Sequence, residues 1–373
     1  MEMNRFSMKH LIYDLNLDLL QKTNPTSIKP REGWITVISM QTIERLRFSL
    51  KGGKNLKTLL MRNLILVLYN HRVIAKSGQS LGVVYVIATA VQLVINGLML
   101  GALYALAAVG LSLIYGVMGV LNLSHGSLLT MAVFITYSLY LLSGNVLAAI
   151  ILAVVLVAVI GIAIEKGAVY PFRAWEMRLL VITFGIGKVL EQIIYVVWGP
   201  IYITTPIYVP GSLEILGVTI SAYRMVLLVL SIALMTGLWI FIQRSKWGKA
   251  IRAIAQDEEA ASIFGVNVKR VRTLTFALAS ALAAIAGTLL SSIYMFRSAS
   301  GWEYLLIALS ITIVGGLGDI RGAVVASFML GVMESCIGYF VSPLWRTTAY
   351  FIFIIIVLTV KPSGLSGLWR GRS

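Results

Sequence analysis

Four residues with polar or small side chains stand together in the stretch LNLSHG, at residues 121–126. No Lys, Arg, Asp or Glu occurs between residues 77 and 164, so Asn122, Ser124, His125 and Gly126 interrupt a region that otherwise suits lipid. An imidazole can bind a metal ion or carry a proton, and a buried amide or hydroxyl can contact a polar solute. A polar group left unpaired in hydrocarbon costs several kcal/mol. These residues therefore either line a passage or form hydrogen bonds at a helix break supplied by Gly126, and the sequence leaves both interpretations open.

The sequence offers no second residue that could bind a metal ion or relay a proton together with His125. The other two histidines, His10 and His71, lie in the first 80 residues, and no series of carboxylates accompanies His125. The single cysteine, Cys336, excludes a disulfide within the chain and any cysteine-based metal site. We therefore predict no metal site.

Two further charged patterns could do chemistry. Lys188 and Glu191 are three residues apart, so they share a helical face and can pair. The pair could couple transport to an ion gradient, or it could be structural. The glycine-rich stretch GGLGDIRG, residues 315–322, lacks dinucleotide-binding spacing and follows an apolar segment rather than a strand, so we expect a tight turn with Asp319 and Arg321 at the inner surface.

Catalytic machinery is absent from the sequence. No GxxxxGK[ST] motif occurs, so the chain supplies no Walker-type ATP site of its own. Nothing resembles a nucleophile beside its base. We therefore predict that the chain is not an enzyme and holds no cofactor.

The overall composition is that of an integral membrane protein. Hydrophobic residues make up 58% of the chain and charged residues 12%, against about a quarter charged in soluble domains. Runs of about 20 apolar residues, the length that crosses a bilayer, recur from residue 83 onward. We predict an all-α, polytopic helical membrane protein with eight or nine spans. The predicted segments are 84–114, 117–142, 146–165, 179–198, 222–242, 273–296, 304–319, 322–341 and 346–360.

The positive charge of the chain indicates its orientation in the membrane. The net charge is +16, and residues 1–80 hold 13 Lys/Arg against 5 Asp/Glu. Seven basic residues between 244 and 272 mark that loop as cytoplasmic. Counting spans back from it places residues 1–80 outside the cell if 84–114 crosses once, which conflicts with their charge. Either 84–114 crosses twice, or residues 1–80 are a basic, poorly ordered extension upstream of the true start. We favour the second alternative. The basic residues of this extension are scattered and form no nucleic-acid-binding motif, so we do not expect nucleic acid as a partner.

Small residues spaced four apart predict where helices touch. Such spacing places them on one helical face, where a neighbouring backbone can approach closely, although membrane helices are rich in Gly and Ala in any case. The residues expected at contacts are Gly97, Gly101 and Ala105, then Ala279, Ala283, Gly287 and Ser291, then Gly318, Gly322 and Ala326.

The loop 243–272 contains an amphipathic segment that is too charged to enter lipid. Residues 249–264 predict one helix, which ends at Gly265. Its expected apolar face consists of Ile251, Ile254, Ala255, Ala261 and Phe264. Such a helix can lie on the membrane surface, dock into a groove of a cytoplasmic partner, or simply connect two spans.

The sequence around this loop resembles a known family. RSKWGKAIRAIAQDEEAASIFGVNVKRVRTLTFALASALAAIAGTLL, from residue 244, is similar to the LivH-type permease subunit of branched-chain amino-acid ABC importers. Three further stretches match it: NGLMLGALYALAAVGLSLIYGVMGVLNLSHG, IEKGAVYPFR and IVGGLGDIRGAVVASFMLGVMES. The resemblance covers residues 90–368 and excludes the first 80, which defines residues 83–373 as the permease domain. Glu258 and Glu259 match poorly, and Arg321 stands where the family usually has Pro.

The resemblance implies a multi-pass subunit of the cell membrane that imports branched-chain or other hydrophobic amino acids. It implies a second, LivM-like permease chain, two cytoplasmic subunits that bind ATP and Mg, and an extracytoplasmic solute-binding protein, for which the loop 199–221 is a candidate contact. It assigns coupling to Ala255, Asp257, Ala261, Ser262 and Gly265. The passage is instead assigned from the residue types themselves, to Asn122, Ser124, His125 and Gly126. Two alternatives stay open: the same type of permease carrying urea or short amides, and an ion-coupled secondary carrier.

Overall fold

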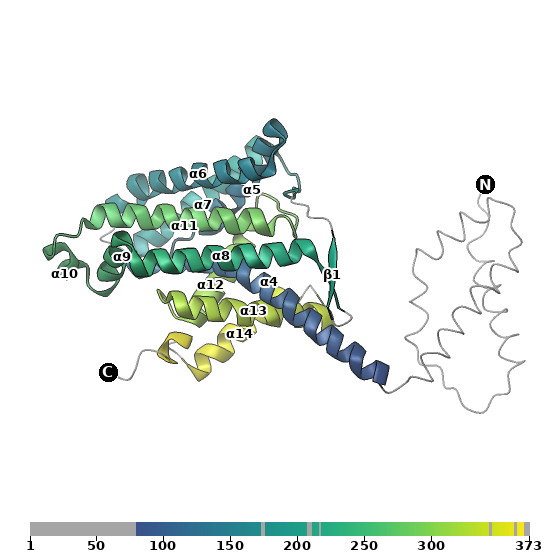
Figure 1. Cartoon of the computed structure of the whole chain (residues 1–373). Helices are drawn as coiled ribbons and strands as arrows, with labels where there is room; N and C mark the ends of the chain where they lie inside the picture. Colours follow the sequence, from purple (N-terminus) through teal and green to yellow (C-terminus); the bar gives the residue numbers. More distant parts are fainter. Residues whose placement is uncertain are drawn as a thin grey trace, which may run out of the picture. The chain divides into compact units, whose positions relative to one another are not determined.

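The computed structural model describes residues 80–172, 176–206, 211–215, 218–342, 345–361 and 364–368. The chain divides into two compact units, Met1–Leu81 and Gly82–Ser373. Residues 1–79 of the predicted extension lie outside the described residues. The described residues therefore belong to the second unit, apart from Ser80 and Leu81, which begin its first helix (Figure 1).

Helix α4 spans Ser80–Met118, and its C-terminal half is enclosed by the other helices. Every residue from 99 to 114 is buried, as expected for a helix that is apolar on all sides. The helix ends at Gly119, whose φ of +71° is left-handed and whose N–H donates to the Tyr115 carbonyl at 2.8 Å. Residues 84–114 therefore form part of one continuous helix, and the alternative of two crossings in this segment is wrong.

The next span starts later than predicted. Residues 117 and 118 belong to α4, residues 119–124 are not helical, and α5 occupies His125–Ser143. A tight turn then reverses the chain: Gly144 has a φ of +66°, and the Asn145 side chain accepts hydrogen bonds from the first N–H groups of α6, Val146–Ile164. A π-helical turn, Glu165–Val169, and a 3-10 turn, Tyr170–Phe172, extend the C-terminal end of α6.

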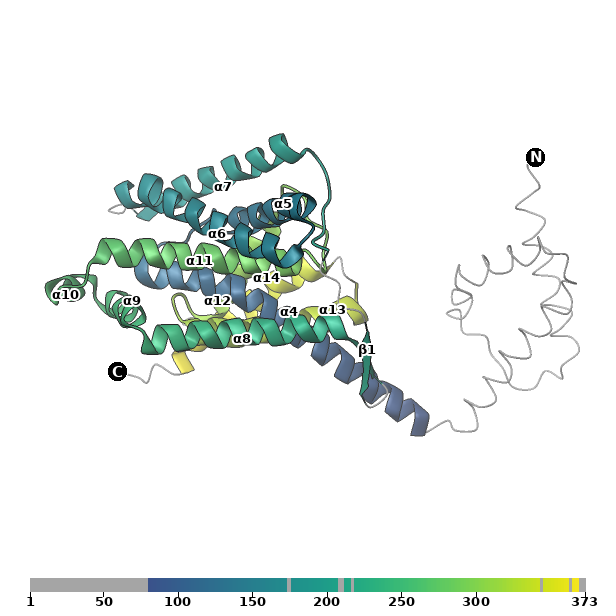
Figure 2. The same ribbon diagram turned by 45° about the horizontal axis from the view of Figure 1, so that its top comes forward.

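The rest of the chain, from residue 176 onward, adds further helices and one short β-hairpin to the bundle. A two-stranded antiparallel hairpin between α7 and α8 is the exception to the all-α prediction, and it lies at the opposite end of the bundle from α9 and α10 (Figure 2). The elements are α7 Glu176–Trp198, β1 Ser212–Ile215, β2 Val218–Ser221, α8 Ala222–Arg244, α9 Lys246–Gln256, α10 Glu258–Ile263, α11 Val268–Leu290, α12 Ser300–Gly315, α13 Ile320–Phe340, α14 Arg346–Val360 and a final 3-10 turn Leu365–Leu368.

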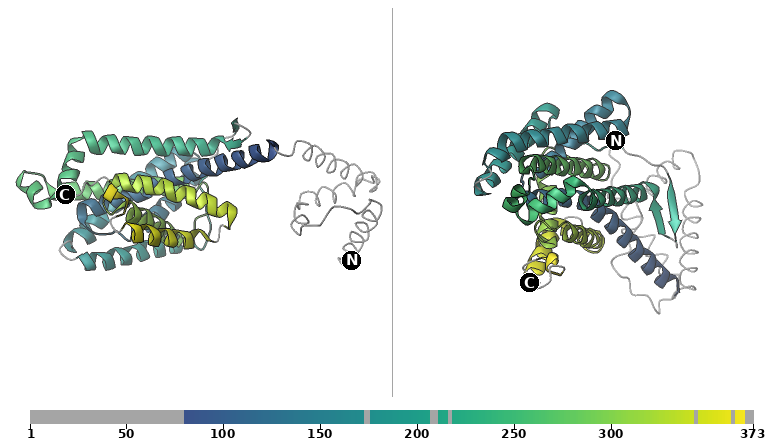
Figure 3. Two further views of the ribbon diagram at one scale, coloured as in Figure 1. Left: turned by 90° about the horizontal axis from the view of Figure 1, so that it is seen from below. Right: turned by 60° about the vertical axis from the view of Figure 1, so that its left-hand side comes forward.

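The polytopic helical prediction is confirmed. Within the described ranges, seven helices are long and apolar enough to cross a membrane, and two shorter apolar helices lie in α12 and α14. Each of the nine predicted segments corresponds to one of these helices. Helices α9 and α10 project from the end of the bundle, as the left view of Figure 3 also shows.

Helix backbones touch at several of the predicted small residues. A Cβ on Gly97 would overlap the backbone of Val332, and one on Gly101 would lie 2.7 Å from the Phe328 Cα, so α4 and α13 meet backbone to backbone. Gly287 of α11 lies in the same way against the Leu129 carbonyl of α5.

The third predicted stripe lies at the turn between α12 and α13. Gly318 approaches Gly116 near the end of α4, where a Cβ on Gly318 would lie 3.2 Å from the Gly116 Cα. A Cβ on Gly322 would overlap the Gly315 carbonyl, and Gly318 has a φ of +78°. Asp319 caps α13 by accepting a hydrogen bond from the Arg321 N–H, so the glycine-rich stretch is a tight turn. Ala283 is fully buried within α11.

Candidate functional site

The polar stretch 122–126 lies at the break between α4 and α5, deep inside the bundle. Asn122, Ser124 and His125 are each at most 2% exposed. The Asn122 Oδ1 accepts hydrogen bonds from the Ser124 N–H at 3.1 Å and from the Ser124 Oγ–H at 2.7 Å. The His125 Nε2–H donates to the Ala107 carbonyl of α4 at 2.9 Å. The Asn122 bonds stabilise the non-helical segment itself, and the His125 bond attaches the first residue of α5 to α4.

The start of α5 therefore lies beside the middle of its neighbours. A Cβ on Gly110 would lie 3.0 Å from both the Ala279 carbonyl of α11 and the His125 Cε1. Gly126 packs against the backbone of Gly301, the second residue of α12, so closely that a Cβ would overlap the Gly301 carbonyl. Two helix starts, each carrying the partial positive charge of its N-terminus, thus meet within the bundle.

Two polar atoms of this stretch lack partners among the described residues. The Asn122 Nδ2 and the His125 Nδ1 are buried and form no hydrogen bond there. Buried polar atoms are usually satisfied, so each calls for an explanation. The hydrogen bonds of Asn122, Ser124 and His125 support the helix-break interpretation, whereas the two orphan atoms are compatible with a polar passage. No group of three or more His, Cys, Asp or Glu residues among those described could hold a metal ion.

The Lys188–Glu191 pair forms on α7, and it is attached to another helix. The Lys188 Nζ lies 2.9 Å from the Glu191 Oε2, which also accepts a hydrogen bond from the Trp302 Nε1–H of α12 at 2.6 Å. The Lys188 ammonium lies 4.5 Å from the centroid of the Trp302 ring. The pair therefore joins α7 to α12, which accounts for it as a structural contact.

The loop 243–272 forms two helices, so the prediction of one helix over 249–264 is wrong. Asp257 is extended, with φ −158° and ψ 111°, and separates α9 from α10. Its Oδ1 accepts a hydrogen bond from the Ala260 N–H at 2.9 Å, which is an N-cap. Aspartate competes with helix propagation by this bond, and so the acidic residue that the resemblance assigned to coupling shapes the corner between the two helices.

Both short helices are attached to membrane helices. The Arg252 Nη1–H of α9 donates to the Ile242 carbonyl of α8. The Arg272 Nη2 of α11 lies 2.5 Å from the Glu258 Oε2 of α10, and the Arg272 side chain is largely buried. These contacts join α9 to α8 and α10 to α11.

The tip of this loop exposes large apolar side chains. Ile263 is 83% exposed and Phe264 87% exposed, so Phe264 does not belong to the buried apolar face that we predicted. The buried residues of that face are Ile251, Ile254 and Ala261, whereas Ala255 is exposed. Of the other predicted coupling residues, Asp257, Ser262 and Gly265 are exposed, and Gly265 has a φ of +81°.

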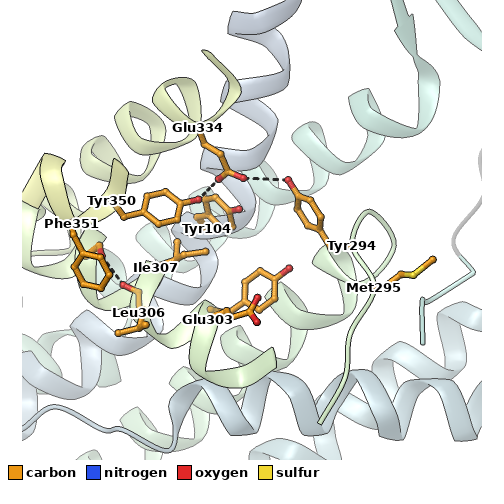
Figure 4. A pocket seen from close by; sticks show the side chains of 11 residues that line it. Tyr104, Tyr294, Met295, Glu303, Leu306, Ile307, Glu334, Tyr350 and Phe351 are labelled. Carbon is orange, nitrogen blue, oxygen red and sulfur yellow. Dashed lines mark hydrogen bonds between the residues drawn. The ribbon is translucent and has the colours of Figure 1, made fainter. Parts of the chain in front are cut away.

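A second group of polar residues, around Glu334, was missed by the sequence analysis. A cavity of about 240 Å³ lies between α4, α12, α13, α14 and the segment that follows α11 (Figure 4). Glu334 is 2% exposed, and its carboxylate accepts hydrogen bonds from the Tyr350 Oη–H at 2.5 Å and the Tyr294 Oη–H at 3.4 Å. Tyr104 of α4 lines the same cavity. The signal was available, because an acidic residue within an apolar span is a functional candidate by default.

Comparisons with known proteins agree with the sequence resemblance. Residues 93–360 match the family described as branched-chain amino acid transport system / permease component. The chain is 30% identical over 292 residues to the high-affinity branched-chain amino acid transport system permease protein LivH of Salmonella typhimurium, covering 74% of this chain and 95% of that protein. It is 29% identical, with the same coverage, to the corresponding protein BraD of Pseudomonas aeruginosa.

A more distant relative belongs to a sugar importer. The ribose import permease protein RbsC of Bacillus subtilis is 28% identical over 209 residues, which are 53% of this chain and 61% of that protein. The match to the family covers most of the spans, from α4 to α14, and includes the 122–126 break, the α9–α10 loop and Glu334. The chain therefore belongs to the family of permease components of branched-chain amino acid transport systems, and it is a multi-pass protein of the cell membrane.

Proposed function

We propose that the chain is one of two membrane-spanning subunits of an ATP-driven importer of branched-chain or other hydrophobic amino acids. The observation that carries this proposal is the α9–α10 loop, which projects from the bundle and ends in the exposed side chains of Ile263 and Phe264. A large apolar side chain exposed at the tip of a charged cytoplasmic loop suits insertion into a groove of a partner protein.

The proposed partners follow from what the chain lacks and from its relatives. No ATP-binding motif occurs in the sequence, so ATP and Mg would be bound by two separate cytoplasmic subunits. A second, related permease chain would complete the membrane part, and an extracytoplasmic protein would deliver the solute. These assignments are carried over from the permease family.

Coupling would run from the loop tip into the membrane helices. Closure of the ATP-binding subunits would displace Phe264, and the Glu258–Arg272 and Arg252–Ile242 contacts would pass that displacement to α11 and α8. Helix α11 in turn touches α5 at the Gly287–Leu129 contact. The start of α5 is the break at residues 122–126, so the same motion would reach the polar stretch.

The passage itself is assigned to this break as a proposal. Asn122, Ser124, His125 and Gly126 interrupt the apolar interior, and the orphan Asn122 Nδ2 and His125 Nδ1 atoms offer hydrogen bonds to a polar solute. A discontinuous helix at mid-membrane depth is a common way to present polar backbone and side-chain groups to a transported molecule.

The test is uptake of radiolabelled leucine into proteoliposomes that contain the chain with its partner subunits and the binding protein. Uptake is expected to require ATP on the side of the membrane that carries the ATP-binding subunits. It is also expected to stop when any one of the partner proteins is left out. Uptake of leucine by the chain alone, driven by an imposed proton or sodium gradient, would instead establish an ion-coupled carrier.

The same assay addresses the solute. If ATP-driven uptake is absent for leucine, isoleucine and valine but present for urea or acetamide with the cognate binding protein, the transporter carries neutral amides. The distant relationship to a ribose permease makes this comparison worthwhile, because the fold of the membrane subunit is compatible with different solutes.

A further inference from the structure

The Glu334 cavity combines a carboxylate with aromatic rings at a depth where charge is costly. Burying a carboxylate in hydrocarbon is expensive unless hydrogen bonds or an opposite charge compensate it. Tyr350 and Tyr294 donate hydrogen bonds to Glu334, and Tyr104 lies beside it (Figure 4). The charged side chains among the described residues that line the cavity are Glu334 and Glu303, both acidic. Glu334 is the buried one of the two, so its carboxylate is the group that a cation entering the cavity would meet.

One aromatic ring of the cavity is held in a fixed orientation by a neighbour. Tyr304 lines the cavity and is stacked on Phe296, with ring centroids 4.7 Å apart and an interplanar angle of 5°. This contact fixes the orientation of the Tyr304 ring. Tyrosine rings attract ammonium groups within about 6 Å of their centroids, and more strongly when the site is shielded from water.

The other walls suit an aliphatic side chain. Leu306, Ile307 and Phe351 line the cavity, and Met295 lies at its exposed edge. The volume of about 240 Å³ exceeds the roughly 150 Å³ in which an engineered cavity holds benzene, so a molecule of leucine size fits. Glu303, the other acidic side chain of the lining, is largely exposed, and its Oε1 lies 3.3 Å from the Arg297 Nη2.

The cavity lies on the side of the membrane from which an importer receives its solute. Helix α11 begins next to the cytoplasmic α10, and the cavity residues Tyr294 and Met295 follow its other end. Tyr350 lies in the first turns of α14 and Glu334 in the last turns of α13. These ends lie opposite the α9–α10 loop, which carries the cytoplasmic charge.

We infer that the Glu334 cavity is a binding site for the ammonium end of an aliphatic amino acid on the extracytoplasmic side of the permease. The inference rests on the proposed function for the identity of its ligand. Glu334 pairs with the ammonium group, the tyrosine rings surround it, and the alkyl chain contacts Leu306, Ile307 and Phe351. The site receives the solute before the 122–126 break and favours amino acids over uncharged molecules of the same shape.

Three probes separate the groups that the cavity recognises. The assembled transporter in nanodiscs, without the binding protein, is titrated with leucine, with isoamylamine, which keeps the ammonium group, and with isocaproate, which keeps only the carboxylate. Binding is measured by saturation-transfer NMR. Leucine and isoamylamine are expected to bind, and isocaproate at least tenfold more weakly.

The variants test Glu334 directly. Glu334→Gln keeps the shape and removes the charge, and it should weaken binding of leucine and isoamylamine at least tenfold. Glu165→Gln is the matched control, because Glu165 is also buried but lies at the cytoplasmic end, where it accepts a hydrogen bond from Thr273 at 2.7 Å. It should leave the binding of both probes unchanged. Unchanged binding in Glu334→Gln, or equal binding of isocaproate, would overturn the site.

A second variant keeps the test decisive if Glu334→Gln does not assemble. Met295 is 72% exposed at the edge of the cavity, so Met295→Trp can obstruct the entrance without disturbing the interior. It should weaken amine binding at least tenfold, and unchanged binding would overturn the inference. Leucine uptake by the unmodified transporter is measured in parallel. Absent uptake counts against the proposed function, whereas normal uptake with amine binding indifferent to both variants counts against this site alone.

Discussion

Gly126 lies so close to the backbone of α12 that its position leaves no room for a methyl group. In Gly126→Ala the new methyl group would overlap the Gly301 carbonyl and lie 2.8 Å from the Leu305 Cβ. The carbonyl belongs to the backbone of α12 and cannot move aside as a flexible side chain would. The helix starts of α5 and α12 must then separate.

The cost can be compared with an identical substitution in open surroundings. Overpacking by one methyl group costs about 1–3 kcal/mol, and a clash with backbone belongs at the upper end of that range. Alanine regains up to about 1 kcal/mol over glycine in a helix. Gly185→Ala in α7 is the matched control, because no atom lies within 4 Å of its would-be Cβ. We expect the two variants to differ by about 3 kcal/mol, Gly126→Ala being the less stable.

The difference is measured as the apparent Tm of the detergent-solubilised complex. At about 2–4 °C per kcal/mol, the scale for domains of 150–250 residues, Gly126→Ala should melt about 6–12 °C below Gly185→Ala. Gly301→Ala should have a similar effect, since its Cβ would lie 2.7 Å from the Gly126 carbonyl, and the double variant should cost less than the sum. If Gly126→Ala melts within 2 °C of Gly185→Ala, the close approach of α5 and α12 is not real.

Three further predictions concern the ends of the bundle. Phe264→Ala should lower ATP-driven uptake at least tenfold while the permease chains still insert into the membrane. Phe172 is also exposed, and Phe172→Ala should leave uptake unchanged. Equal uptake by the two variants would show that the tip of the α9–α10 loop takes no part in coupling. Glu258→Ala should lower the free energy of unfolding by about 1–2 kcal/mol more than Arg272→Met, because Glu258→Ala leaves the largely buried Arg272 cation without its partner. A larger loss of stability in Arg272→Met, measured by thermal unfolding, would contradict this. Glu191→Gln should cost about 1 kcal/mol of stability and leave uptake intact, and lost uptake by a well-folded variant would instead favour ion coupling.

The spans were predictable because hydrophobicity alone determines them. Each predicted segment corresponds to an apolar helix, since a chain in lipid must satisfy its backbone groups within the segment. The boundaries failed where side chains compete with the helix. Because apolar residues surround Asn122, the second span was predicted to begin at residue 117 and to include the break. The structure places the start of α5 at His125, because the Asn122 side chain accepts a hydrogen bond from the backbone N–H of Ser124. Asp257 divides the cytoplasmic helix for the same reason.

The candidate sites were less predictable because they depend on contacts between distant segments. The exposure of Phe264 could not follow from its apolar type, which fits equally well on a buried face. Glu334 lies in a stretch that reads as a span, and its partners Tyr294 and Tyr350 come from other elements. A cavity of this kind forms only when helices α4, α12, α13 and α14 are brought together, and no local pattern in the sequence encodes that.

Helix α11 links these features into one mechanical element. At its cytoplasmic end Arg272 binds Glu258 of α10, and in its middle a Cβ on Gly161 of α6 would overlap Ser280. Near its other end Gly287 touches Leu129 of α5, and four residues beyond its end Tyr294 reaches Glu334. A helix of 23 residues transmits displacement along its axis because its hydrogen bonds resist stretching. A movement imposed on α10 therefore has a continuous path of direct contacts to both the 122–126 break and the Glu334 cavity, as the proposed ATP-driven import requires if the two places are to change together.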